Sequence, residues 1–177
     1  MANHDLDMII SDCLRKLFAE ISSPEWRGRE REIVSRFCFG YLIHRYDPEK
    51  IGMEVAVPQL SRDDLLKFNP KTHMPRRDVC KDIVIWSNAG MATFGTDWIA
   101  CHEPLAIMEW TAFNRLDRPG TRAKKNIKHN YDQRWLQRKS ELVRGFVGYA
   151  ALADTTSSTK ELVCARAYEG VLSPLMF

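Results

Sequence analysis

The run from Pro104 to Phe113, PLAIMEWTAF, contains one carboxylate, Glu109, among residues that otherwise predict a buried strand. Side chains alternate across a strand, so Glu109 shares a face with Ile107 and Phe113, which are apolar. Moving a carboxylate out of water costs several kcal/mol unless another group pairs with it. We therefore expect Glu109 to point inward and to have a partner.

The rest of the chain predicts helices and strands around that run. Apolar residues between Asp5 and Ile21 recur at helical spacing, and a second helix is expected from about Trp26 to Arg45, where Asp47-Pro48 ends it. The later segments alternate between strand and helix patterns: strands at 51–60, 81–86 and 104–113, a helix at about 126–143, and strands at 145–153 and 161–168. The order ααβββαββ predicts an α/β (α+β) fold, a central mixed sheet flanked by helices.

Length and composition limit the kind of protein. With 177 residues, 45% of them hydrophobic, we expect a single domain over 1–177, with a helical extension at 1–23 and a core at 26–170. The chain contains neither an apolar run of the roughly 18 residues that a membrane span needs nor a leader pattern. We therefore expect a soluble, cytoplasmic protein without a membrane partner. Five scattered cysteines without a Cys-x-x-Cys pair argue against a disulfide framework and a structural zinc site.

Charge is unevenly distributed. Ten basic and three acidic residues lie between Arg115 and Arg144, so this segment carries +7 while the chain as a whole carries +3. A polyanion such as nucleic acid is a plausible partner, although a solvated helix face after a basic loop explains the same pattern. The residues expected to contact nucleic acid are Arg115, Arg118, Arg122, Lys124, Lys125 and Lys128.

Two further carboxylates are expected to point inward. Asp82 opens the apolar strand KDIVIW, and consecutive strands are usually neighbours, so Asp82 and Glu109 can reach one point. Glu30 falls on the packing side of the second helix with Val34. Two carboxylates repel unless a proton or cation lies between them, and Mg²⁺ or Mn²⁺ would relieve this. The expected metal ligands are Asp82, Glu109 and the backbone carbonyl of Trp110.

Each acid also has a structural interpretation. Glu109 could pair with a buried arginine such as Arg77 or Arg115, Asp82 could cap a turn, and Glu30 could lie above the edge of the core. Tryptophans are open to two interpretations as well, because they can stack on bases or fill the core. Those concerned are Trp86, Trp98 and Trp110.

The order of elements and acids resembles the PD-(D/E)XK nuclease superfamily, which has the restriction-endonuclease-like fold. The likeness covers roughly residues 26–170. EREIVSRF, which begins at Glu30, is similar to the opening helix of archaeal Holliday-junction resolvases, in which the first glutamate helps to bind metal. The resemblance implies a metal-dependent nuclease that hydrolyses phosphodiester bonds in DNA. Many proteins of this fold act as dimers, so a homodimer is compatible with the resemblance, and the first helix is open to two interpretations, a dimer surface or a lid on the sheet.

The sequence departs from the family at one chemical position. Where the family has Glu-x-Lys, this chain has Glu109-Trp110-Thr111, and threonine has no charge to offer at the scissile phosphate. A substitute cation would have to come from elsewhere, and Lys81, Arg115, Lys124 and Lys125 are all candidates. The resemblance implies a catalytic set of Glu30, Asp82, Glu109 and, in place of the lysine, Thr111. The alternative is a nuclease-like module that has lost catalysis and binds nucleic acid or a protein.

Overall fold

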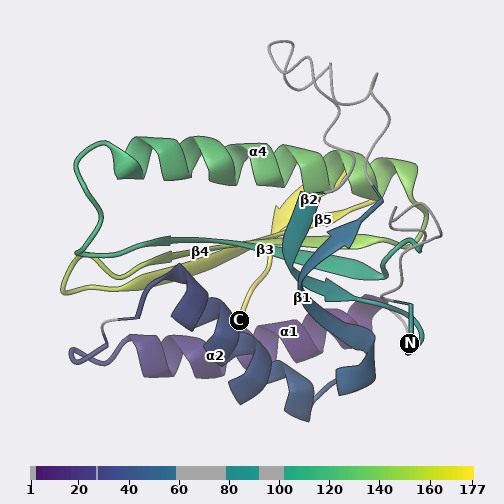
Figure 1. The fold of residues 1–177 in the computed structure, drawn as a ribbon, viewed down its shortest axis with the longest axis horizontal. Coiled ribbons are helices and arrows are strands. Elements are labelled where there is room, and N and C mark those ends of the chain that lie inside the picture. Colours follow the sequence, from purple (N-terminus) through teal and green to yellow (C-terminus); the bar gives the residue numbers. More distant parts are fainter. Residues whose placement is uncertain (1–2, 27, 59–78, 92–101) are drawn as a thin grey trace.

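The computed structural model describes residues 3–26, 28–58, 79–91 and 102–177. Its centre is a six-stranded sheet in the order β1-β2-β3-β4-β5-β6 (Figure 1). All neighbouring strands are antiparallel except β3 and β4, which are parallel and joined by the crossover helix α4. The strand bounds are β1 Ile51–Val57, β2 Val79–Ile85, β3 Ala106–Phe113, β4 Val147–Asp154, β5 Glu161–Tyr168 and β6 Val171–Pro174.

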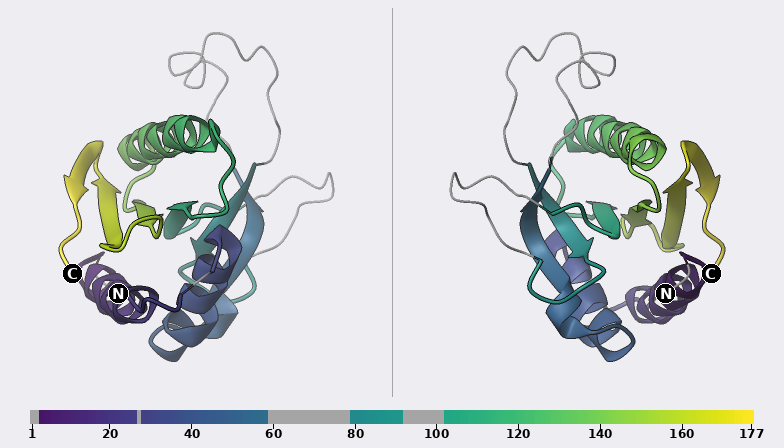
Figure 2. Two further views of the ribbon diagram at one scale, coloured as in Figure 1. Left: turned by 90° about the vertical axis from the view of Figure 1, so that its left-hand side faces the viewer. Right: turned by 90° about the vertical axis from the view of Figure 1, so that its right-hand side faces the viewer.

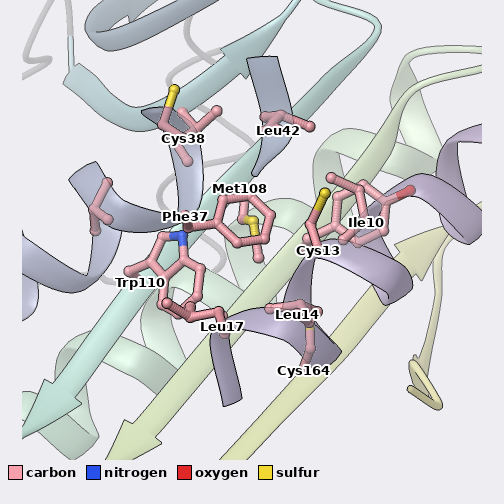
Figure 3. Packing of buried hydrophobic residues seen from close by; sticks show 14 of the residues in the cluster. Ile10, Cys13, Leu14, Leu17, Phe37, Cys38, Leu42, Met108, Trp110 and Cys164 are labelled. Carbon is pink, nitrogen blue, oxygen red and sulfur yellow. The ribbon is translucent and has the colours of Figure 1, made fainter. Parts of the chain in front are cut away.

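Two helices cover one face of the sheet. α1 (Asn3–Ile21) and α2 (Glu30–Gly40) lie on the side opposite α4 in Figures 1 and 2. The apolar stripe of α1 is buried against the sheet, and Phe37 of α2 packs on Trp110 of β3 with ring centroids 5.3 Å apart (Figure 3). Because its apolar stripe is buried within the chain, α1 is a lid on the sheet, and the stripe itself is not a dimer surface.

The helix α4 (Thr121–Leu142) covers the other face. Trp135 and Leu136 of this helix pack with Ile107 of β3 in a second, smaller core. Met108 and Trp110 belong to the first core, so β3 alternates between the two faces as predicted. Every residue of β3 is buried, which places Glu109 inside the protein on the α4 side.

The sheet forks between β2 and β3. The two strands pair only from Ile83↔Met108 to Ile85↔Ala106, although β3 continues to Phe113 and β2 begins at Val79. Between Val79 and Lys81, β2 pairs with β1 and not with β3. We call this divergence the fork. Along it, β3 has no strand partner on its β2 side among the described residues.

Several sequence predictions of the elements need correction. The helix predicted from about 126 begins at Thr121, so the basic residues Arg122, Lys124 and Lys125 lie on a helix and not in a loop. The second helix ends at Gly40 and is followed by two short 3₁₀ turns, Leu42–His44 and Pro48–Lys50. The strand β6 was not predicted. None of the helices in the described part of the chain is long and apolar enough to cross a membrane.

Candidate functional site

The fork leaves backbone groups of β3 to be satisfied by side chains. N–H and C=O of one strand residue point to the same edge, and residues two apart repeat that direction. Trp110 and Ala112 therefore both face the fork, and we call their four backbone groups the open edge of β3. Buried backbone groups need hydrogen-bond partners. At the open edge these partners have to be side chains, because β3 has no strand partner there among the described residues.

A carboxylate and a lysine satisfy each residue of the open edge. The Trp110 N–H donates to Asp82 Oδ2 at 2.7 Å, and Lys128 Nζ donates to the Trp110 carbonyl at 2.8 Å. One step along the strand, the Ala112 N–H donates to Glu30 Oε2 at 2.9 Å, and Lys125 Nζ donates to the Ala112 carbonyl at 2.5 Å. The acids come from β2 and α2, and both lysines come from α4.

Glu109 has the partner that its burial demands. Its Oε1 forms a salt bridge with Lys81 Nζ, and the two side chains are only 6% and 3% exposed. The Lys81 ammonium also lies 3.9 Å from the centre of the Trp135 ring, a cation–π contact. The pair is thus enclosed between β2, β3 and α4.

Lys81 reaches this position because the side chains of β2 change from one face of the sheet to the other along the strand. Ile83 packs in the core under α1 and α2, whereas Lys81, two residues earlier, lies over Trp135 on the other face. Residues two apart share a face in a regular strand, so β2 rotates between them. On β1, Glu54 has a left-handed backbone (φ 51) between the register pairs Met53↔Ile83 and Val55↔Lys81. This distortion of the β1–β2 ribbon accompanies the rotation.

Asp82 and Glu109 lie close enough to repel. Burial, and then the negative charge of Glu109, raise the pKa of Asp82 from 3.8 to about 6. The hydrogen bond from the Trp110 N–H opposes this shift. The result is a pair of neighbouring carboxylates for which a nearby positive charge is favourable.

Lys128 supplies one such charge and is itself held by Asp132. Asp132 is buried, and its Oδ2 lies 3.1 Å from Lys128 Nζ one helical turn away. Burial acts to lower the pKa of Lys128, but the charges of Asp132, Asp82 and Glu109 outweigh it and raise that pKa. Lys128 is therefore a cation stabilised by three acids, with a side chain that is still 45% exposed.

A cleft of about 800 Å³ opens beside the fork on the α2 side. Glu30, Asp82 and Lys125 line it, which connects the open edge of β3 to solvent. Its remaining charged lining residues are three cations and two acids: Arg29, Arg31, Arg118, Glu54 and Asp117. Cations and acids are therefore equal in number in the lining of the cleft, and two of the cations, Arg31 and Lys125, are paired with Glu54 and Asp117.

The residues predicted to contact nucleic acid are dispersed. Lys125 and Arg118 line the cleft, and Lys128 lies on the open edge. Arg115 donates to the Thr156 carbonyl, Arg122 pairs with Asp154, and Lys124 is exposed on α4.

The other candidate residues are also located. Thr111 is fully buried on the strand face of Glu109, and within the described residues its hydroxyl has no hydrogen-bond partner. Trp86 and Trp110 are core residues rather than exposed stacking platforms. Trp98, and Arg77 as a partner of Glu109, lie outside the described residues. The partner of Glu109 shown here is Lys81, not Arg115.

Two site residues escaped the sequence reasoning in part. Asp132 was not singled out, and Lys128 was expected only as a phosphate contact. Their i, i+4 spacing is the signal that could have linked them, because it puts an acid and a base on one side of α4. For Glu30, Asp82 and Glu109, the pattern predicted side chains that point inward, but it did not predict the fork beside which they lie. Across residues 3–26, 28–58, 79–91 and 102–177, no three His, Cys, Asp or Glu side chains are grouped closely enough to hold a metal ion.

Searches against protein-family models, curated proteins and solved structures found no match to this chain.

Proposed function

We propose that this chain is a metal-dependent nuclease that hydrolyses phosphodiester bonds in DNA, with its site at the fork. The observation that carries the proposal is the contact between Asp82 and Glu109 on diverging strands, beside a cleft lined by arginines, a lysine and acids. The order of elements, with a helix on each face and β4 parallel to β3, supports the restriction-endonuclease-like fold that the resemblance implies.

The donor groups suit a hard divalent cation. Asp82 and Glu109 offer carboxylate oxygens, and the Trp110 carbonyl already accepts a hydrogen bond from a positively charged group, Lys128. Mg²⁺ and Mn²⁺ prefer such oxygen ligands and keep several waters, so a site with two carboxylates is sufficient. The proposed ligands are therefore Asp82, Glu109 and the Trp110 carbonyl.

The chain's own residues would share the remaining work. A bound metal ion lowers the pKa of its water and stabilises charge on the phosphate. Glu30 faces the cleft next to Asp82 and can orient a water molecule there. Lys81 balances the buried charge of Glu109, and Lys128, with its partly exposed side chain, can take the part of the missing motif lysine at the phosphate.

One alternative has an observation in its favour. Each of the three acids already has a partner in the chain: Lys81 for Glu109, and the N–H groups of Trp110 and Ala112 for Asp82 and Glu30. A module that has lost catalysis and only binds nucleic acid or a protein would also satisfy its acids in this way.

A cleavage assay separates the two functions. Plasmid and branched DNA should be cut in Mg²⁺ or Mn²⁺ and left intact in EDTA. Glu109→Gln and Glu30→Gln should each reduce the rate by at least about 100-fold, the lower end of the range for removing one electrostatically stabilising group from an active site. Glu32→Gln is the matched control for Glu30, because Glu32 lies on the same helix and accepts from the Arg29 N–H, which glutamine can also do. Circular dichroism checks that each variant is folded.

DNA binding without cutting, under every metal condition, would favour the inactive module. Cutting that is equal in Glu109→Gln, Glu30→Gln and wild type would exclude a site at the fork.

A further inference from the structure

Lys128 occupies the backbone oxygen that the proposed metal site would use. Its Nζ lies 2.8 Å from the Trp110 carbonyl, on the same open edge where Asp82 binds the Trp110 N–H. The charges of Asp82 and Glu109 both act on this ammonium. In the chain by itself, Lys128 is thus the positive charge on the Trp110 carbonyl and acts on Asp82, while Lys81 pairs with Glu109.

Resting on the proposed metal site, we infer that Lys128 is a tethered cation that exchanges with the divalent ion: ion binding displaces its ammonium from the Trp110 carbonyl toward Asp132. An ammonium and a divalent cation repel at contact distance, so the two do not share one carbonyl and one pair of carboxylates. Binding of the Lys128 ammonium and binding of the divalent ion at this carbonyl are thermodynamically linked, so each weakens the other by the same factor.

Asp132 defines where the displaced ammonium can go. This buried carboxylate lies 3.1 Å from Lys128 Nζ and is not a proposed metal ligand. Lys128 can leave the carbonyl and keep this partner, so its charge stays beside the site instead of dispersing into solvent. Asp132 is therefore a positioning residue that acts through Lys128.

Lys125 provides a matched control for the exchange. It comes from the same helix, and it binds the next carbonyl of the open edge, that of Ala112, together with Asp117. Removing either lysine deletes one positive charge near the acids. Only Lys128, however, lies on the carbonyl that is proposed to bind the ion.

Mn²⁺ binding to the metal-free protein measures the competition directly. Isothermal titration should give Lys128→Met a dissociation constant about tenfold or more below that of wild type, within the usual range of coupling between two ligands. Lys125→Met should stay within about threefold of wild type, since it changes only the general electrostatics. Equal tightening in both variants, or weaker binding in Lys128→Met, would overturn the exchange.

A second readout uses the wild-type chain and so does not depend on the folding of a variant. Reductive methylation, read by peptide mass spectrometry, should modify Lys128 faster when Mn²⁺ is added, while exposed Lys124 reacts at an unchanged rate. Protection of Lys128 by Mn²⁺ would contradict displacement. Absence of Mn²⁺ binding in all three proteins would remove the metal site itself, whereas exchange without DNA cleavage would leave this inference standing and reject only the nuclease activity.

Discussion

Asp82 is the residue in which burial and function oppose each other most directly. It binds the Trp110 N–H, which favours its charged form, yet burial and the neighbouring Glu109 raise its pKa to about 6. A raised carboxyl pKa means that the folded chain holds the proton more tightly than the unfolded chain does. The stabilisation from this proton is complete below pH 4 and is lost as the pH rises through 6.

We therefore predict that Asp82→Asn gains stability relative to wild type as the pH rises. In EDTA, the difference in the free energy of unfolding between variant and wild type should shift toward the variant by about 1–3 kcal/mol from pH 4 to pH 7. Asparagine can still accept the bond from the Trp110 N–H, so the comparison isolates the charge. Urea denaturation at both pH values measures it, and an identical difference at pH 4 and pH 7 would disprove it.

The burial of Glu109 could be predicted from the sequence, but its partner could not. The alternation of Ile107, Glu109 and Thr111 against Trp110 correctly predicted that Glu109 is buried, because an even period is built into any regular strand. Of the two arginines that the structural interpretation named as partners, Arg77 lies outside the described residues and Arg115 does not pair with Glu109, whose partner is Lys81. This partner was not predicted because β2 rotates beside Glu54, and an irregular backbone leaves no trace in a hydrophobic pattern.

At the scale of elements, α4 is fixed to the sheet by a close approach at Gly148 of β4. A Cβ atom added there would lie 2.7 Å from Leu136 Cβ and 3.0 Å from its Cδ2. Leu136 is fully buried between helix and sheet, so it has no free space into which to move. The position of α4, and with it the placement of Lys125 and Lys128 on the open edge, depends on this contact.

Gly148→Ala should destabilise the protein by about 1–3 kcal/mol through overpacking. Leu136→Ala alone should cost about 2–5 kcal/mol, as a cavity in a core does. The double variant should lose clearly less than the sum of the two, because the shortened side chain makes room for the new methyl group. Urea unfolding of the four proteins tests this, and additive losses would show that Gly148 and Leu136 do not meet.

Element types were easier to predict than element ends. The helices around Leu14 and Trp135 and the five longer strands follow from their apolar patterns, at helical spacing in the helices and as alternating or continuous short runs in the strands. The start of α4 at Thr121 was missed because its first turns carry lysines and arginines instead of apolar residues. The strand β6 is four residues long and partly exposed, too short to show a period.

At the scale of the whole molecule, one carboxylate connects the two ends of the chain. Asp7 of α1 accepts hydrogen bonds from the Tyr149 hydroxyl at 2.7 Å and from Arg166 Nε at 2.8 Å. Tyr149 lies on β4 and Arg166 on β5, so this contact holds α1 to the half of the sheet that lies away from the fork. Closure of the first core depends on it as well as on the apolar stripe.

Asp7→Asn should lower the free energy of unfolding by about 1–3 kcal/mol, because the buried tyrosine and the arginine lose a charged acceptor. Asp5→Asn is the matched control: Asp5 is exposed in the first turn of the same helix, and its loss should cost less than about 1 kcal/mol. Chemical denaturation compares the two, and equal effects would show that Asp7 acts only through the helix dipole.

The charged couples along β3 also bear on self-association. A strand with bare N–H and C=O groups is a template onto which another polypeptide can add in extended form. At the fork, the backbone groups that such a polypeptide would bind are already bonded to side chains of Asp82, Lys128, Glu30 and Lys125. The fork can therefore stay open to a ligand without promoting aggregation. Among the described strands, the risk of strand addition falls on the outer strands β1 and β6.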